Sequence, residues 1–335
     1  MSDFGDALVT RTKFIVPPIK RTQLRRERLH LLLDNAQDQR VTLVLGGTGY
    51  GKSSLLAGYL HERQSAALWY ELSDRDADPQ VFALHLAHLF NRAHAGVADR
   101  ALALLALPGG AAKQGPAAIE ALADALLDRL DGETCLVLDD FHHLQGSETA
   151  LQLANHLIGM RVPHLRIIVA SRLRPDLPSL ARWRLQGDAL FIEQSDLAFR
   201  ADEIEALFTE VLALPLQPGM TERLMSETEG WPMALQLMAQ RQGVGLPESR
   251  GSLRDLFDYL ASEVLDRLDA RDREFLLRTA PMQRLLPEVC RDLTGRDAAE
   301  ALEGLNERGI FLVPLGDGVY RYHHLFREKS EAKRS

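Results

Sequence analysis

The chain of 335 residues is longer than one average domain, so two or three domains are expected. A hydrophobic fraction of 46% with a charged fraction of 26% is typical of globular proteins and excludes a largely disordered chain. The net charge of −8 excludes a broad electrostatic attraction to nucleic acid. The amino-terminal stretch lacks the apolar segment of a signal peptide, and no stretch is long enough to span a membrane. We therefore expect a cytoplasmic protein with no membrane partner.

Near its start the chain is locally basic. Seven basic residues stand against one acidic residue, Glu27, between Arg11 and Arg28. A solvated helix start is the ordinary explanation of such a run. Its place just before a glycine-rich loop favours a segment that packs along a nucleotide.

The first 198 residues alternate short apolar runs with amphipathic segments. The runs are short and apolar, several of them β-branched, and the first ends in glycines, which predicts buried strands. Strands are expected at 40–47, 66–73, 134–144, 165–172 and 189–195, and helices at 53–63, at 78–95 and, broken by PGG and GP, twice between 97 and 130. Alternating strands and helices indicate an α/β fold with a parallel, doubly wound sheet, which binds ligands at the carboxyl ends of its strands. Cys135, inside one run, is expected to be an inert core residue.

After about residue 198 the strand pattern stops. The next expected helix has one apolar stripe, formed by Ile204, Leu207, Phe208, Val211 and Leu212. Pro232 suits the first turn of a further helix, and more helices follow from Leu253. Two strand-like runs near the end, joined by Gly-Asp-Gly, suggest a winged-helix unit. The expected domains are a P-loop nucleotide-binding domain at 1–198, a helical lid domain at 199–265 and a winged-helix domain at 266–335.

A glycine-rich loop follows the first expected strand. The segment Gly46–Ser53, GGTGYGKS, fits G-x-x-x-x-G-K-[ST] at every fixed position, between a buried strand and an amphipathic helix. The glycines let backbone N–H groups turn inward around phosphate oxygens, Lys52 reaches the β- and γ-phosphates, and the Ser53 hydroxyl can ligate Mg²⁺. The expected nucleotide-binding residues are Gly46, Gly47, Thr48, Gly49, Tyr50, Gly51, Lys52, Ser53 and Ser54.

Polar residues also end two later strands. Asp139, at the end of the run LVLD, would face the magnesium ion together with Ser53. The adjacent Asp140 could orient or deprotonate an attacking water, or it could be a solvated carboxylate at a strand end. Arg172 could sense the γ-phosphate or be an ordinary exposed arginine. The catalytic candidates are thus Asp140, Lys52 and Arg172, and the metal-ligand candidates are Ser53 and Asp139.

These motifs occur in an order similar to that of the signal-transduction ATPases with numerous domains. More specific stretches resemble the nucleotide-binding half of the maltose-operon-activator family of LuxR-type bacterial transcription regulators. They are TKFIVPP, LRRERL, WYELSDRDADPQVF, SRLRPDLP, DLAFRADEIEALF and GWPMALQL. The likeness runs from about Thr12 to Phe326. It implies an AAA-like P-loop domain followed by helical and winged-helix domains, with ATP or ADP and Mg²⁺ as cofactors.

The resemblance also implies roles for three residues outside the loop. Pro232 in GWP looks like the proline of a Gly-x-Pro motif that packs against adenine, although the same proline suits a plain helix start. Arg26 in LRRERL matches a basic position that lines the nucleotide. His323 in YRYHHLF matches a winged-helix histidine that approaches the β-phosphate of ADP, with His324 as the alternative.

Such a family implies a molecular switch with a weak ATPase activity. ADP would hold the three domains closed, whereas ATP with an inducer or regulatory protein would open them and permit self-association. Slow hydrolysis would reset the switch. A small-molecule kinase and a motor ATPase acting on nucleic acid are the alternatives, but the net charge supplies no basic groove for the latter.

DNA reading by the winged helix itself is a further alternative. The helix expected before its hairpin carries four acidic residues against Arg308 alone, which would repel phosphate. If the protein regulates transcription, DNA is therefore expected to bind only through a domain absent from this chain. A fragment of a longer regulator or a truncated relative would both fit.

Overall fold

The computed structural model describes residues 9–36, 38–63, 66–243, 268–307, 312–316 and 318–322. The chain forms two compact units. The first comprises Met1–Gly46 and Lys52–Leu197, and the second comprises Gly47–Gly51 and Ala198–Ser335. The tip of the glycine-rich loop therefore belongs with the carboxy-terminal half of the chain.

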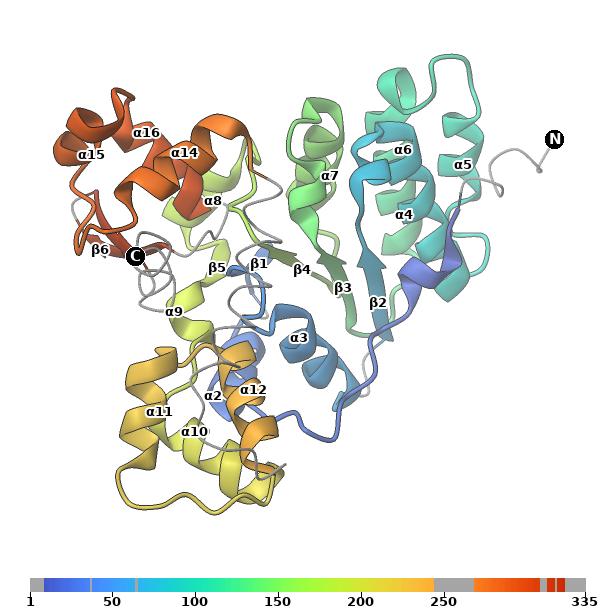
Figure 1. Ribbon diagram of the computed structural model, residues 1–335. Coiled ribbons are helices and arrows are strands. Elements are labelled where there is room, and N and C mark those ends of the chain that lie inside the picture. Colours follow the sequence, from blue (N-terminus) through green and yellow to red (C-terminus); the bar gives the residue numbers. More distant parts are fainter. Residues whose placement is uncertain are drawn as a thin grey trace. The chain divides into compact units, whose positions relative to one another are not determined.

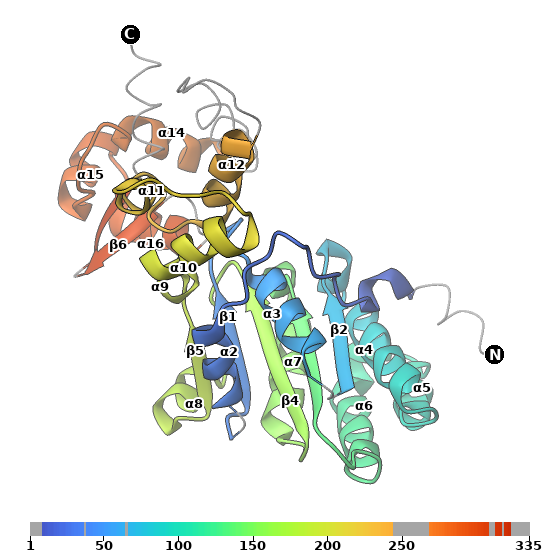
Figure 2. The same cartoon turned by 90° about the horizontal axis from the view of Figure 1, so that it is seen from below.

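A five-stranded parallel sheet forms the centre of the first unit. Its strands are β1 (Val41–Leu45), β2 (Ala66–Glu71), β3 (Thr134–Asp139), β4 (Leu165–Ser171) and β5 (Ala189–Ile192). Their order across the sheet is β2-β3-β4-β1-β5 (Figure 2). Every residue of β1 and β3 is buried, as expected for strands covered on both faces. The expected α/β fold with a parallel, doubly wound sheet is confirmed.

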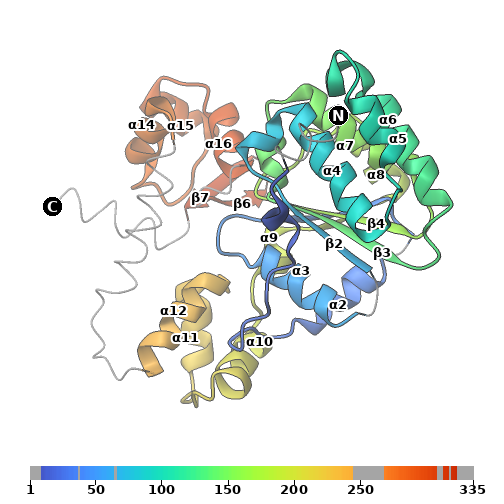
Figure 3. The same ribbon diagram turned by 90° about the vertical axis from the view of Figure 1, so that its right-hand side faces the viewer.

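Helices cover both faces of this sheet. Figures 1 and 3 show α4, α6 and α7 over one face and α2 and α3 over the opposite face. The helices of the unit are α2 (Glu27–Asp34), α3 (Lys52–His61), α4 (Pro79–Ala93), α5 (Asp99–Leu105), α6 (Gly110–Leu127), α7 (Glu148–Met160), α8 (Leu180–Gln186) and α9 (Gln194–Leu197). Short 3₁₀ turns add η1 (Arg11–Phe14), η2 (Asp74–Ala77) and η3 (Phe141–Leu144).

The break expected at GP was wrong. Two helices do lie between residues 97 and 130, but α6 continues through Pro116, and the chain turns earlier, at 106–109. The residue before this proline lies close to a neighbouring helix. A Cβ at Gly115 would lie 2.7 Å from Cδ2 of Leu153, so α6 packs very closely on α7. This packing outweighs the tendency of proline to end a helix.

The described residues of the second unit are helical apart from one hairpin. Its described helices are α10 (Ala201–Ala206), α11 (Met220–Thr228), α12 (Pro232–Gly243), α14 (Ala270–Thr279), α15 (Pro287–Thr294) and α16 (Ala298–Glu307). A π-helical turn over Leu207–Val211 continues α10, so Val211 and Leu212 of the expected stripe are only half-buried. None of the helices in the described part of the chain is long and apolar enough to cross a membrane.

The hairpin consists of β6 (Leu312–Gly316) and β7 (Val319–Tyr322), which pair antiparallel. It shares a buried cluster with α14, α15 and α16, to which Phe275, Cys290 and Leu302 contribute. The hydroxyl of Tyr322 lies 2.5 Å from that of Thr279 and anchors β7 to α14. The expected hairpin after the helices is thereby confirmed.

Candidate nucleotide-binding site

The glycine-rich loop joins β1 to α3. The N–H of Gly46 donates to the carbonyl of Ser171 at 3.2 Å, which extends the pairing of β1 with β4. Gly49 and Gly51 both have φ of +79°, in the left-handed region that residues with side chains avoid. Nothing lies within 4 Å of a Cβ built on Gly51, so its backbone conformation alone requires glycine. Such a backbone can form a concave array of N–H groups for an anion.

Lys52 begins α3 and folds back over the loop. Its ammonium donates to the carbonyl of Gly46 at 2.6 Å, and its side chain is buried. Burial lowers the pKa of Lys52 to about 8, although the charge of Asp140 opposes the shift. The structure thus holds beside the loop a buried cation whose charged form is disfavoured chiefly by burial. Ser54, two residues along α3, is exposed.

Asp139 lies at the carboxyl end of β3 and is buried. Burial raises its pKa to about 6, a hydrogen bond from Ser53 lowers it, and the neighbouring charge of Asp140 raises it again. The hydroxyl of Ser53 and the carboxylate of Asp139 are therefore already paired. Hydroxyl and carboxylate oxygens are hard ligands of the kind that Mg²⁺ prefers, so these two residues fit the ion.

Asp140 directly follows β3 in the left-handed conformation, with φ of 52°. Its N–H donates to Oδ1 of Asp139 at 3.0 Å, and its own carboxylate is partly exposed. Oδ1 of Asp140 lies 3.7 Å from Nδ1 of His142. Asp140 is thus positioned at the strand end and accessible to solvent, as a residue that orients water must be.

Arg172 follows β4 and is half-buried. Its charge lowers the pKa of both Lys52 and His142, which places it in the same group of charges. Sequence reasoning missed His142, whose pKa falls to about 4, chiefly through burial. Its buried Nδ1 has no hydrogen-bond partner among the described residues. The only signal in the sequence was its position two residues after Asp140.

Arg26 lies in the first unit, away from any free surface. Its guanidinium is buried, and Nη1 donates to the carbonyl of Leu197 at 3.0 Å. Arg28 donates likewise to the carbonyl of Asp196 at 2.6 Å. This part of the basic segment therefore binds α9. The contact of Arg26 with a nucleotide stays a prediction.

Pro232 occupies the first position of α12 and is buried, as expected for a proline in a first helical turn. Its packing against adenine stays a prediction. His323 and His324 lie outside the described residues.

In the second unit the loop tip contacts the start of α12. The indole Nε1–H of Trp231 donates to the carbonyl of Thr48 at 3.2 Å, and the N–H of Met233 donates to the carbonyl of Gly49 at 3.2 Å. The rings of Tyr50 and Trp231 have centroids 6.4 Å apart. Sequence reasoning singled out GWP for its proline and missed the tryptophan, which gives no signal of a partner 183 positions away.

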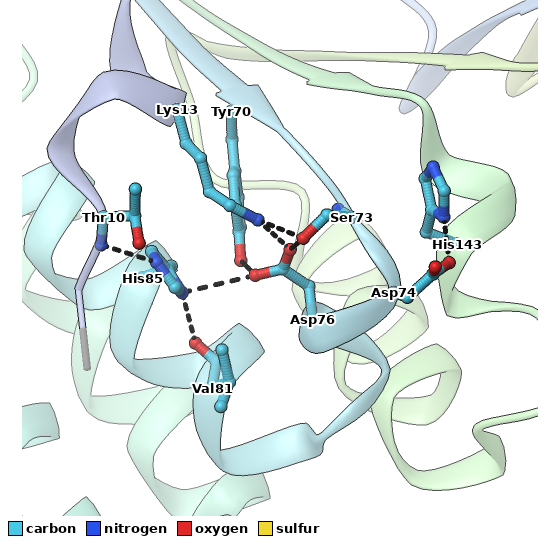
Figure 4. A network of polar contacts seen from close by, with 9 residues as sticks. All are labelled: Thr10, Lys13, Tyr70, Ser73, Asp74, Asp76, Val81, His85 and His143. Atoms are coloured by element: carbon cyan, nitrogen blue, oxygen red, sulfur yellow. Dashed lines mark hydrogen bonds and ion pairs between the residues drawn. The ribbon is translucent and has the colours of Figure 1, made fainter.

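A separate polar network pins the amino-terminal segment to β2 and α4 (Figure 4). The buried carboxylate of Asp76 accepts hydrogen bonds from the Tyr70 hydroxyl at 2.7 Å, from Ser73 and from the ammonium of Lys13. Nε2 of His85 accepts the N–H of Thr10 at 3.0 Å. The stretches TKFIVPP and WYELSDRDADP thus contact each other, and the contact is structural.

Comparison with known proteins identifies the class. A family described as "AAA ATPase domain" matches residues 19–169, and a family described as "MalT winged helix domain" matches residues 261–332. The structure of the Walker-type ATPase of Pyrococcus abyssi superposes with a TM-score of 0.63 at 16% identity, covering 95% of this chain and 99% of that one, which shows a shared fold. Residues 19–169 are therefore similar to AAA ATPase domains and residues 261–332 to MalT winged helix domains, and the shared fold confirms the expected fold class.

Sequence relatives narrow the class further. The HTH-type transcriptional regulator MalT of Yersinia pestis (strain Pestoides F) is 31% identical over 315 residues, which cover 90% of this chain and 34% of the relative. The regulator of the same name from Yersinia enterocolitica gives the same values. The chain is thus similar to MalT over its P-loop and winged-helix regions, as its motifs indicated. It spans about a third of the length of the curated relatives that it matches.

Proposed function

We propose that this chain is the nucleotide-operated switch of a bacterial transcription regulator. ADP binds in a closed resting state, ATP binds in an open state that self-associates, and slow hydrolysis returns the second state to the first. One observation carries the proposal: Lys52, Ser53 and Asp139 are grouped beside a phosphate loop in a chain that also has a MalT winged helix domain.

The buried charges support phosphate binding. The ammonium of Lys52 is held by the Gly46 carbonyl, and phosphate oxygens would replace this neutral acceptor with a charged one. Ser53 and Asp139 would hold Mg²⁺, and the ion would neutralise part of the phosphate charge. Asp140 would orient the attacking water, and Arg172 would contact the γ-phosphate.

The remaining roles follow from the similarity to MalT. Pro232 would pack against adenine, Arg26 would line the nucleotide, and His323 would approach the β-phosphate in the closed state. A nucleotide can shift the balance of states only by its difference in affinity for them, so these contacts must differ between ADP and ATP. An inducer or regulatory protein would supply the remaining bias.

The proposed link to transcription rests on the relatives. The matched proteins are named HTH-type transcriptional regulators, and this chain aligns with a third of their length. DNA binding is therefore assigned to a part of such a regulator outside the matched region. The acidic face of α16, which exposes Glu303, agrees with a winged helix that does not grip phosphates.

Thermal unfolding with ADP, with ATP and without nucleotide tests the proposal. A ligand held at about a hundred times its dissociation constant adds roughly 2.7 kcal/mol of stability. We expect this stabilisation in the wild type and in Lys113→Ala, an exposed lysine of α6, and its loss in Lys52→Ala, each compared with its own nucleotide-free baseline. The absence of any stabilisation in the wild type would rule out the switch.

ATP turnover separates the switch from its rivals. A switch hydrolyses ATP slowly without any acceptor. Turnover that requires an added small acceptor would identify a kinase, and turnover that rises steeply with nucleic acid would identify a motor.

A further inference from the structure

The tip of the phosphate loop is held at two consecutive carbonyls. The indole N–H of Trp231 donates a hydrogen bond to the carbonyl of Thr48, and the backbone N–H of Met233 donates one to the carbonyl of Gly49. Both distances are 3.2 Å. Trp231 directly precedes α12, Met233 lies in its first turn, and both belong to the same compact unit as the loop tip. Each is a normal N–H···O hydrogen bond near the long end of the range.

Fixing these carbonyls also fixes the direction of the loop amides. A peptide bond is planar and trans, so the C=O of one residue and the N–H of the next point in opposite directions. Since the carbonyls of Thr48 and Gly49 face α12, the N–H groups of Gly49 and Tyr50 face away from it. These N–H groups belong to the array that a phosphate loop offers to its ligand. The Tyr50 N–H makes only a long bond of 3.5 Å to the Gly47 carbonyl, which a phosphate oxygen can displace.

Close packing restricts the loop tip further. A Cβ on Gly49 would lie 2.8 Å from Cβ of Met233 and 3.0 Å from Nε1 of Trp231, so only glycine admits α12 at this distance. The side chain of Tyr50 packs against the buried cluster that contains Trp231. The tip therefore cannot rotate without moving the indole.

The support beneath Trp231 is itself rigid. Glu229 and Gly230 both have positive φ, and a Cβ on Gly230 would lie 2.3 Å from the carbonyl oxygen of Phe199. The N–H of Phe199 donates to the carbonyl of Gly230 at 2.8 Å. Arg321 of β7 forms two hydrogen bonds with the carboxylate of Glu229, at 2.7 and 2.8 Å. The indole is thus presented from a fixed turn that is tied to the hairpin.

We propose that Trp231 is a positioning residue of the nucleotide site: its indole N–H orients the phosphate loop so that the amides of Gly49 and Tyr50 are presented to the β-phosphate. The inference rests on the proposed nucleotide binding. It differs from the predicted role of Pro232, because it acts on the phosphates through the loop and makes no contact with adenine. A change at Trp231 should therefore alter the affinity for ligands that carry a β-phosphate and leave the affinity for other ligands unchanged.

The test is Trp231→Phe, which removes the N–H and keeps an aromatic ring. We expect the affinity for ADP to fall about fivefold, the ratio that corresponds to one net hydrogen bond. The affinity for AMP, which lacks the β-phosphate, should stay unchanged. A merely structural role of the indole would weaken both ligands alike or neither.

Trp183→Phe is the matched control. Its indole is fully buried in the first unit, and its Nε1 has no hydrogen-bond partner among the described residues. We expect both affinities to match those of the wild type. Binding of ADP to Trp231→Phe as tight as to the wild type would overturn the inference and leave the proposed function standing. A wild type that binds no ADP would remove the proposed function first.

A second measurement covers the case in which Trp231→Phe does not fold. The chain has three tryptophans, so the double variant Trp69→Phe/Trp183→Phe leaves Trp231 as the only indole. We expect its fluorescence to change with ADP and to saturate at the concentration at which ADP stabilises the same protein thermally. Stabilisation by ADP without a change in fluorescence would overturn the inference.

Discussion

Two buried carboxylates of the first unit, Asp76 and Asp139, each feel the charge of a lysine, yet their pKa values move in opposite directions. Burial alone raises the pKa of Asp76, but hydrogen bonds from Lys13, Tyr70 and Ser73 outweigh it and hold the pKa below its usual range. Burial raises the pKa of Asp139 to about 6, and the hydrogen bonds from Ser53 and from the N–H of Asp140 do not offset it. The two pKa values differ because Asp76 accepts more hydrogen bonds and because Asp139 lies next to the like charge of Asp140.

The comparison separates a structural charge from a functional one. Asp76 is compensated by protein groups and therefore has no need of a ligand. Asp139 and Lys52 are both shifted toward their neutral forms, so a bound ion or phosphate would stabilise their charged forms. Such incomplete compensation, grouped at the carboxyl ends of strands, is typical of binding and catalytic sites.

The largest expected effect comes from breaking the compensated cluster. Asp76→Ala removes the counter-charge of Lys13 and the acceptor of the Tyr70 hydroxyl, so the free energy of unfolding should fall by about 3–5 kcal/mol. Chemical denaturation measures it. Asp74→Ala is the matched control in the same short turn. Its side chain is 96% exposed and pairs only with His143, so its effect should stay within about 0.5 kcal/mol. Equal losses in the two variants would contradict the comparison.

The sequence predicted the group around Lys52 and Asp139 more completely than the cluster around Asp76. Lys52, Asp139 and Arg172 each stand beside the carboxyl end of a recognisable strand, and in a parallel sheet those ends meet at one edge. The Lys13–Asp76 contact joins residues 63 positions apart and follows no general rule of strand geometry. Its two stretches were visible only as a resemblance, with no physical reason attached.

Tertiary packing accounts for the other features that the sequence did not reveal. α6 runs through a proline and packs closely on α7 where Gly115 meets Leu153, and no local pattern contains that information. The hydrogen bond of Trp231 to the loop is of the same kind. The sequence predicted that the loop glycines let N–H groups turn inward, but not that α12 also requires glycine at position 49.

A smaller effect on stability should follow from neutralising the carboxylate of Asp139. Asp139→Asn removes a buried charge, so nucleotide-free protein should become about 1–3 kcal/mol more stable at pH 7. The expected change in the free energy of unfolding is thus opposite in sign to that expected for Asp76→Ala. Because the folded pKa of Asp139 lies above the unfolded value, the folded state binds more protons between about pH 4 and 6, and wild-type stability falls as the pH rises through that window. The advantage of Asp139→Asn should therefore grow from pH 4 to 6 and then remain constant.

Denaturation series at several pH values check this pattern. Asp128→Asn, at an exposed position after α6, should show no such growth. An Asp139→Asn variant that is less stable than the wild type at pH 7 would mean that the carboxylate is compensated after all.

The smallest effect concerns the protonation of Lys52. Burial lowers its pKa to about 8, so at pH 8.5 much of the lysine is neutral in the nucleotide-free protein. Bound phosphates favour the ammonium and raise this pKa, so ADP binding should take up roughly half a proton. Asp139 is ionised at this pH with or without ligand and contributes nothing. Calorimetry in two buffers of different ionisation enthalpy measures the uptake as a difference in binding heat.

Lys52→Arg distinguishes this proton from every other source. A guanidinium stays charged at pH 8.5, so a variant that still binds ADP should show the same heat in both buffers. Uptake that persists in Lys52→Arg would assign the proton to another group. Heat that is independent of buffer in the wild type would mean that Lys52 is already charged, and the contrast between a compensated and an uncompensated cluster would then rest on Asp139 alone.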